Sequence, residues 1–78
     1  MLRVTTAALG WSVNVSAVER ARILHGWTRR ELAQKARVDE GTISDLLAGR
    51  RRPTFGTLRA VCDALAISLS GVIEFAET

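Results

Sequence analysis

The chain has 78 residues and a mass of 8.5 kDa, so it forms one small domain and leaves no room for a two-domain enzyme. A hydrophobic content of 47% excludes a disordered tail, and polar residues interrupt the longest uncharged stretch, residues 4–18, which excludes a membrane span. Eleven Lys and Arg residues against eight Asp and Glu residues give a net charge of +3, a mild indication of an anionic partner.

Residues 1–15 precede the first helical pattern of the chain. They combine strand-like residues with an aperiodic stretch, so we expect either a short strand or an ordered arm that contacts a second subunit. Five short helical patterns then fill residues 16–75, and residues 76–78 form a tail. These boundaries predict a compact all-α domain of five helices.

The first two helices have recognisable ends. The first helix has its inner face at Val18, Ala21 and Leu24 and ends at His25–Gly26. Thr28 and Glu31 have the spacing of a capping box, in which each side chain bonds the backbone amide of the other residue. The second helix therefore begins after Thr28, has its inner face at Leu32, Ala33 and Ala36, and should end near Arg37–Val38.

The other three helices follow at short intervals. Asp39 is placed to cap a third helix that runs to Ala48, and Gly49 ends it. A basic loop then leads to Pro53, and Thr54 caps a fourth helix. Ser68 is predicted to cap a fifth. The expected inner faces of these helices are Ile43, Leu46 and Leu47; Leu58, Val61, Cys62 and Leu65; and Leu69, Val72 and Ile73.

Reactive residue types are few and scattered. Cys62 has no second cysteine for a disulfide, and we interpret it as a core residue. His25 fits a surface cation at a helix end, and Trp27 fits the core better than a base-stacking site. Trp11 either folds onto its own domain or docks on a partner subunit. We expect no enzyme, no metal and no cofactor, because catalytic, metal-ligand and phosphate-loop spacings are missing.

Positive charge is concentrated in the middle of the chain. Residues 20–59 contain ten basic and four acidic residues, a net charge of +6 (ten minus four). Nearly all of the basic residues are Arg, whose guanidinium offers two parallel donors to a phosphate or a guanine. Charge alone leaves open whether this surface binds an anion or is simply solvated.

Residues 28–47 resemble the helix-turn-helix of the lambda repressor and Cro family, also called the XRE family. The family pattern has an apolar and then a small residue in its first helix, an apolar residue after the turn, and two apolar residues in its second helix. This chain supplies Leu32, Ala33, Val38, Ile43 and Leu46 at those positions. The resemblance extends over about residues 16–75.

The resemblance implies that the third helix lies in the DNA major groove. The base-reading residues would be Glu40, Gly41, Thr42, Ser44 and Asp45. The phosphate-binding residues would be Arg22, Thr28, Arg29, Arg50, Arg51 and Arg52, with Thr28 and Arg29 acting partly through their backbone amides.

This sequence departs from the family pattern at three places. Arg37 stands where the family commonly has Gly, so either a left-handed backbone there carries a cost of about 1 kcal/mol or the turn differs slightly from the family's. Leu47 replaces an acidic residue that often pairs with an Arg in the first helix, so we expect Arg22 to be free for phosphate. Glu40 and Asp45 place carboxylates on the reading surface, where they can accept from cytosine but repel phosphates.

These features predict a sequence-specific, duplex-DNA-binding transcriptional regulator, similar to a phage Cro or repressor protein or to a bacterial XRE-type relative. We expect it to be cytoplasmic and associated with the nucleoid. One domain covers a half-site, so we expect a homodimer on its operator, joined through residues 2–15 or residues 69–75. The alternative is a protein-interaction module, such as the antitoxin of a toxin–antitoxin pair, which the acidic residues of the reading helix favour.

Overall fold

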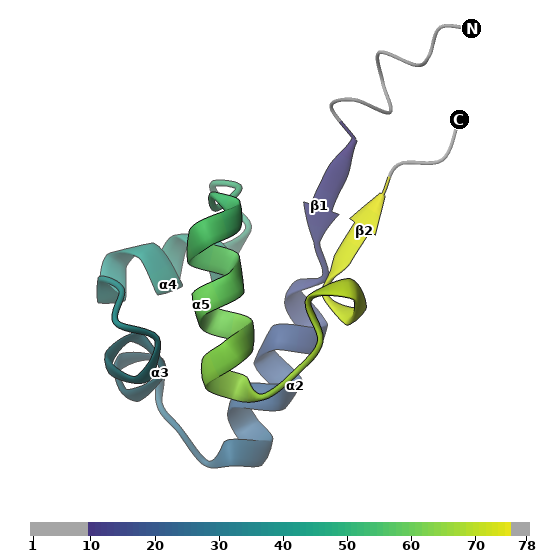
Figure 1. The fold of residues 1–78 in the computed structure, drawn as a ribbon. Helices are drawn as coiled ribbons and strands as arrows, with labels where there is room; N and C mark the ends of the chain where they lie inside the picture. Colours follow the sequence, from purple (N-terminus) through teal and green to yellow (C-terminus); the bar gives the residue numbers. More distant parts are fainter. Residues whose placement is uncertain (1–9, 76–78) are drawn as a thin grey trace, which may run out of the picture.

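The computed structural model describes residues 10–75, so the expectations for residues 1–9 and for the tail 76–78 lie outside the described part. Helices form the body of the domain (Figure 1), which confirms the predicted all-α class. The elements in chain order are β1 (Trp11–Val13), α2 (Val15–His25), α3 (Arg29–Ala36), α4 (Glu40–Ala48), α5 (Phe55–Leu65), the 3₁₀ helix η1 (Leu69–Gly71) and β2 (Ile73–Phe75). No helix within residues 10–75 is both long enough and apolar enough to cross a bilayer.

The two strands pair with each other although they lie at opposite ends of the described chain. They run antiparallel, with Trp11 opposite Phe75 and Val13 opposite Ile73, and they project from the helices (Figure 1). Of the N-terminal segment, the described part thus contains a strand, Trp11–Val13. The two segments expected to form a dimer interface thus meet in one small sheet.

The predicted fifth helix is wrong. Only η1, one 3₁₀ turn, follows the Ser68 cap, and the chain then enters β2. Val72 still closes the core, at 1% exposed, and its carbonyl accepts from the Asn14 amide at 2.7 Å. Pairing with β1 gives the backbone after Val72 its hydrogen-bond partners, so extended structure replaces the helix.

Most of the predicted helix ends are confirmed. Gly26 and Gly49 end their helices in the left-handed conformation, and the hydroxyl of Thr54 caps α5. Asp39 occupies the N-cap of α4, but its side chain makes no capping hydrogen bond. The first helix begins before residue 16 because the Asn14 side chain caps it, accepting from the Ala17 amide.

One core lies between the four α-helices. Its buried residues are Val18, Ala21, Leu32, Ala33, Ala36, Ile43, Leu46, Leu47, Leu58, Val61, Cys62, Leu65 and Val72. These include every predicted inner-face residue of α3, α4 and α5. Leu24 was expected in the core and is 79% exposed. The last turn of α2 is joined to α5 by the exposed His25, whose Nε2 donates to the Leu65 carbonyl at 2.7 Å and whose ring stacks on Trp27.

Within residues 10–75, two residues other than glycine adopt the left-handed backbone conformation. Arg37, at φ 61°, ends α3, which confirms the conformation considered from the family pattern. Ala66, at φ 59°, ends α5 and was not foreseen. A Cβ atom in this region crowds the following carbonyl, so both helix ends carry backbone strain.

We expect Arg37→Gly to raise the free energy of unfolding by about 0.5–1 kcal/mol, because the relief of strain exceeds the added freedom of the unfolded chain. Urea unfolding followed by circular dichroism measures this change. Arg37→Ala is the matched control, since it removes the same side chain but keeps Cβ. A glycine variant no more stable than the alanine variant would show that this turn is unstrained.

Candidate nucleic-acid interface

The turn Arg37–Asp39 joins α3 to α4 and fixes how the two helices cross. Its first amide, on Arg37, bonds the last turn of α3, and the Val38 amide donates to the Ala33 carbonyl at 3.0 Å. Val38 packs against the core, while Ala33 is buried at 3% exposed. The small Ala33 side chain, at the position where the family pattern has a small residue, leaves room for the two helices to approach closely.

One side of α4 faces the core, and the other side reaches the surface. Ile43, Leu46 and Leu47 are buried, so the residues between them point outward. The predicted base-reading residues are all outside the core: Glu40 and Gly41 are exposed, and Thr42, Ser44 and Asp45 are partly exposed. The structure thus brings the predicted reading residues onto one accessible helix.

The basic loop that follows α4 lies beside this helix. Arg50 Nε donates to Asp45 Oδ1 at 3.0 Å, and Arg52 Nη1 donates to the Trp11 carbonyl at 2.8 Å. Arg51 makes no hydrogen bond or ion pair within residues 10–75. A hollow of about 210 Å³ lies between α4, the loop and the start of α5. Its lining includes Thr42, Asp45, Arg51, Arg52, Thr54 and Thr57. Two predicted reading residues and two predicted phosphate-binding residues therefore surround one site.

The N-terminus of α3 contains the predicted capping box. The Thr28 hydroxyl accepts from the Glu31 amide at 3.0 Å, and the Thr28 amide donates to Glu31 Oε1 at 2.8 Å. Because the box uses the Thr28 amide, the expectation of a phosphate seat made of two amides needs correction. The Arg29 amide, in the first turn of the helix, is the one left to an anion.

Glu19 on α2 holds two of the predicted phosphate-binding arginines. Its Oε1 accepts from Arg22 Nε at 2.6 Å, and its Oε2 accepts from Arg29 Nη2 at 3.2 Å. Arg22 Nη1 also donates to the Trp27 carbonyl at 2.7 Å, and its side chain is only 17% exposed. The expectation that Arg22 is free is therefore wrong. Arg22 connects the end of α2 to the segment before α3, because it bonds both Glu19 and the Trp27 carbonyl. Glu19 thus supplies the acidic partner that Leu47 does not.

These hydrogen bonds from Arg22, and then those from Arg29, hold the pKa of the Glu19 carboxyl below its ordinary value, although partial burial opposes them. Glu19 thus stays ionised and keeps both guanidinium groups in place. Burial raises the pKa of the Cys62 thiol, which stands 1% exposed in the core as predicted.

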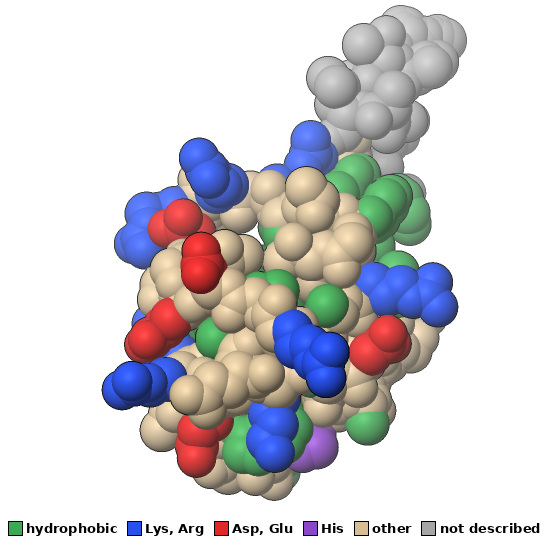
Figure 2. Space-filling model, turned by 60° about the vertical axis from the view of Figure 1, so that its left-hand side comes forward, with side chains coloured by type: hydrophobic (Ala, Val, Ile, Leu, Met, Phe, Trp, Pro, Cys, Tyr) green, Lys and Arg blue, Asp and Glu red, His purple; other side chains and the backbone are tan. Residues whose placement is uncertain are grey.

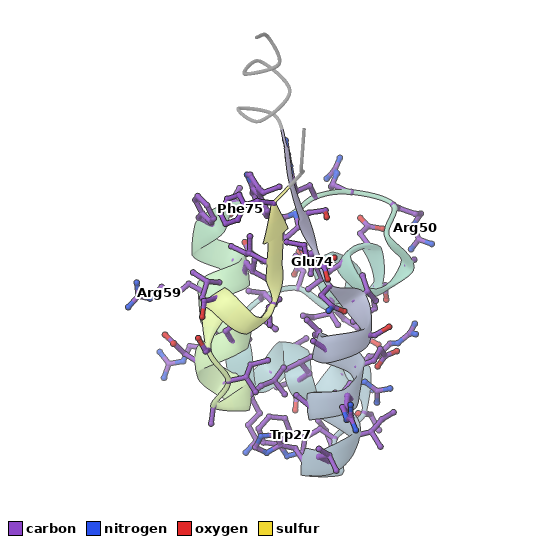
Figure 3. The ribbon with its side chains drawn as sticks, turned by 90° about the vertical axis from the view of Figure 1, so that its right-hand side faces the viewer. Trp27, Arg50, Arg59, Glu74 and Phe75 are labelled. Atoms are coloured by element: carbon purple, nitrogen blue, oxygen red, sulfur yellow. The ribbon has the colours of Figure 1, made fainter. Side chains whose placement is uncertain are left out.

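Acidic side chains lie among the basic ones on the surface seen in Figure 2, so the net positive charge forms no uninterrupted patch there. Arg50 lies on the loop near the strand pair, whereas Trp27 lies at the opposite end of the domain (Figure 3). Trp27 packs against the core, beneath the Lys35 ammonium at 5.5 Å, as its core assignment predicted. Within residues 10–75 no group of three His, Cys, Asp or Glu side chains has the arrangement of a metal site.

A family model described as helix-turn-helix matches residues 18–72, well over half of the chain. The chain belongs to the helix-turn-helix family. The match includes all four α-helices except the first turn of α2, and it confirms the XRE-type resemblance seen in residues 28–47. This is a family of DNA-binding transcription regulators and not one of enzymes.

Similar proteins include the transcriptional regulator ClgR from two strains of Mycobacterium tuberculosis. Each is 39% identical over 67 residues, which cover 86% of this chain and 60% of the relative. This helix-turn-helix chain therefore spans about 60% of the length of those curated relatives. The crystal structure of the clp gene regulator ClgR from C. glutamicum superimposes with a TM-score of 0.65 at 37% identity, covering 73% of this chain and 74% of the other.

The contacts of two residues around the site were not identified from the sequence. Glu19 was overlooked although its spacing to Arg22, three residues along a helix, is a usual one for an ion pair. Trp11 was noticed, but nothing in the sequence indicated its neighbours. Its ring stacks on Phe55 at 4.8 Å between centroids and lies 4.7 Å from the Arg52 guanidinium, so it folds onto its own domain.

We expect Glu19→Gln to lower the free energy of unfolding at neutral pH by about 1 kcal/mol, since a neutral amide accepts more weakly from two guanidinium groups. The folded state lowers the pKa of Glu19, so its contribution is present above the ordinary value of 4.5 and is lost as the pH falls below it. Thermal unfolding at several pH values should show the variant and the unaltered chain converging in acid. A difference that persists unchanged in acid would contradict this account, and Glu40→Gln serves as the exposed control.

Proposed function

We propose that this domain binds duplex DNA in a sequence-specific way, with α4 in the major groove, and that it regulates transcription as a homodimer on its operator. The observation that carries the proposal is the outward face of α4 beside the loop Arg50–Arg52. Side chains suited to base edges, Thr42 and Asp45, lie there around the same hollow as Arg51, which is suited to phosphate. The ClgR relatives, which are named as transcriptional regulators, support the same role.

The reading residues offer several kinds of base contact. The hydroxyls of Thr42 and Ser44 donate or accept, while the carboxylates of Glu40 and Asp45 accept from cytosine N4. Arg50 occupies only one oxygen of Asp45, so the other oxygen stays available to a base. A Cβ atom at Gly41 would meet no protein atom within 4 Å, so packing does not require this glycine. Its bare backbone permits a close approach of α4 to the DNA.

Phosphate contacts position the protein at both ends of the helix-turn-helix. Arg51 has no partner within residues 10–75, so it is the loop residue best placed to hold a phosphate, with Arg50 beside it. At the N-terminus of α3, the Arg29 amide and its half-exposed guanidinium form a second contact. In this proposal Arg22 and Thr28 support that contact without touching phosphate. Arg22 helps to hold Glu19, which bonds Arg29, and Thr28 with Glu31 caps the start of α3.

The homodimer would form at the strand pair. A two-stranded sheet has open edges that favour further pairing, and Phe75 and Phe55 are 68% and 54% exposed near it. A second copy related by a two-fold axis would cover these rings. It would also place the second α4 on the adjacent half-site, about one helical turn away.

Selection from random duplex DNA at two salt concentrations tests the DNA-binding proposal. We expect enrichment of an inverted repeat with a strong loss of affinity in salt. Asp45→Asn keeps an acceptor for Arg50 but favours adenine over cytosine, so it should change the preferred base at a single position. Arg51→Ala should weaken all sequences alike and reduce the salt slope by about one.

The proposal fails if Asp45→Asn selects the same site as the unaltered chain, because α4 then does not read that base. Salt-sensitive retention without an enriched sequence would leave only a basic surface. Absence of any binding would favour the protein-interaction module, with a partner docked on Glu40 and Asp45.

Sedimentation of exposed-residue variants tests the dimer. We expect Phe75→Glu to yield a monomer, because two carboxylates would be buried at the two-fold axis. Leu24→Glu, a matched change at a residue 79% exposed on α2, should leave the dimer intact. A dimer that survives Phe75→Glu and dissociates with Leu24→Glu would place the interface on α2.

A further inference from the structure

The loop after α4 is attached to the domain at two places. On one side, Arg50 bonds Asp45 of α4. On the other side, Arg52 bonds the backbone carbonyl of Trp11 and lies against the indole ring. Arg51 stands between these attachments and lines both neighbouring hollows, the one beside α4 and a larger one of about 540 Å³ beside β1.

Trp11 connects three parts of the fold that are far apart in the sequence. Its backbone pairs with Phe75 of β2, its ring stacks on Phe55 at an interplanar angle of 7°, and its carbonyl receives Arg52 from 41 residues away. Phe55 is the first residue of α5, just after the loop. The indole therefore holds the loop at its Arg52 end and also holds the helix that follows the loop.

We infer that Trp11 is a positioning residue for DNA binding. It holds Arg52, and through Arg52 it keeps the loop in the shape that presents Arg51 beside α4, without itself touching DNA. Arg52 accordingly serves as the anchor of the loop rather than as a phosphate ligand. This inference rests on the proposed function, because it assigns a task only if the domain binds duplex DNA.

The physical basis is the entropy of the loop. A loop that is already ordered loses less conformational freedom when Arg51 meets a phosphate than a loop that must be ordered on binding. The contact between Arg52 and Trp11 combines a hydrogen bond to a carbonyl with a cation–π interaction, so it restrains both the position and the orientation of the guanidinium. Trp11→Ala keeps the carbonyl but loses the cation–π contact with Arg52 and the stack on Phe55, so loss of the indole should loosen the loop and weaken binding through Arg51.

Two other roles for Trp11 would give different results. If the indole stacked on DNA, or if it merely supported folding or dimerisation, its removal would weaken binding by the same factor with or without Arg51. If it acts through the loop, its removal matters only while Arg51 is present. A double-mutant cycle between Trp11 and Arg51 separates these cases.

The experiment measures the Kd for a mixed-sequence duplex of about 25 base pairs by fluorescence anisotropy at low salt, since phosphate contacts do not depend on sequence. We expect Trp11→Ala to raise Kd about 5- to 10-fold in the unaltered chain and less than about 2-fold in the Arg51→Ala chain. Equal factors in the two backgrounds would overturn the inference. Leu24→Ala, which removes an exposed apolar side chain of α2, is the control expected to leave Kd unchanged.

Two further variants keep the test valid if Trp11→Ala unfolds. Trp11→Phe retains a ring for Phe55 and Arg52 and should bind within about 2-fold of the unaltered chain. Phe55→Ala removes the stacking partner and leaves the strand pairing alone, and its effect should likewise disappear without Arg51. If Phe55→Ala raises Kd by the same factor in the Arg51→Ala chain, Trp11 and Phe55 do not act on DNA binding through the loop.

A measurement without DNA separates failure of this inference from failure of the proposed function. Backbone ¹⁵N relaxation should show lower order parameters at Arg50–Arg52 in Trp11→Ala, while α3 stays unchanged. Unchanged order parameters in the loop would overturn the attachment itself. If the loop loosens as expected but the unaltered chain binds no duplex at all, the proposed function is wrong and Trp11 has no part in DNA binding.

Discussion

The close crossing of α3 and α4 is the constraint on which the rest of the domain depends. The crossing requires the small Ala33 side chain and a turn that starts from a left-handed Arg37. Once α4 is fixed there, its apolar side completes the core, and its polar side stays at least partly exposed. The accessible face of α4 is thus a consequence of packing, and backbone strain at Arg37 is the cost of the turn that creates it.

Acidic residues organise the basic ones in this domain. Glu19 holds Arg22 and Arg29 near the N-terminus of α3, and Asp45 holds Arg50 beside α4. Of the two carboxylates that looked unfavourable on a DNA-binding surface, Asp45 therefore has a partner, Arg50, whereas Glu40 has none within residues 10–75. These ion pairs fix the positions of the guanidinium groups. A modest net charge of +3 is then sufficient, because contacts with phosphates depend on where each Arg lies more than on the total charge.

Features set by neighbouring residues were predictable from the sequence, and features set by distant contacts were not. Glycines at helix ends, the capping box at Thr28 and the inner faces of α3 to α5 follow from local spacing, and the structure confirms them. Strands of three residues are too short to show alternation, so Ile73–Phe75 was taken for part of a helix. At the end of α2, His25 and not Leu24 contacts α5, through the Leu65 carbonyl. The position of the Trp11 ring is set by its contacts with Phe55 and Arg52. Of the site, the reading helix and basic loop were predicted, whereas the partners of Arg22 and Arg52 were not.

The most direct test of the account is an NMR titration of the ¹⁵N-labelled chain with the duplex that selection enriches. The account predicts that the largest shift changes fall on the amides of Glu40–Asp45 and Arg50–Arg52, with a smaller group at Arg29. It also predicts that amides around Leu24, on the exposed part of α2, stay where they are. Shift changes concentrated on α2, with α4 unaffected, would contradict the placement of α4 in the major groove.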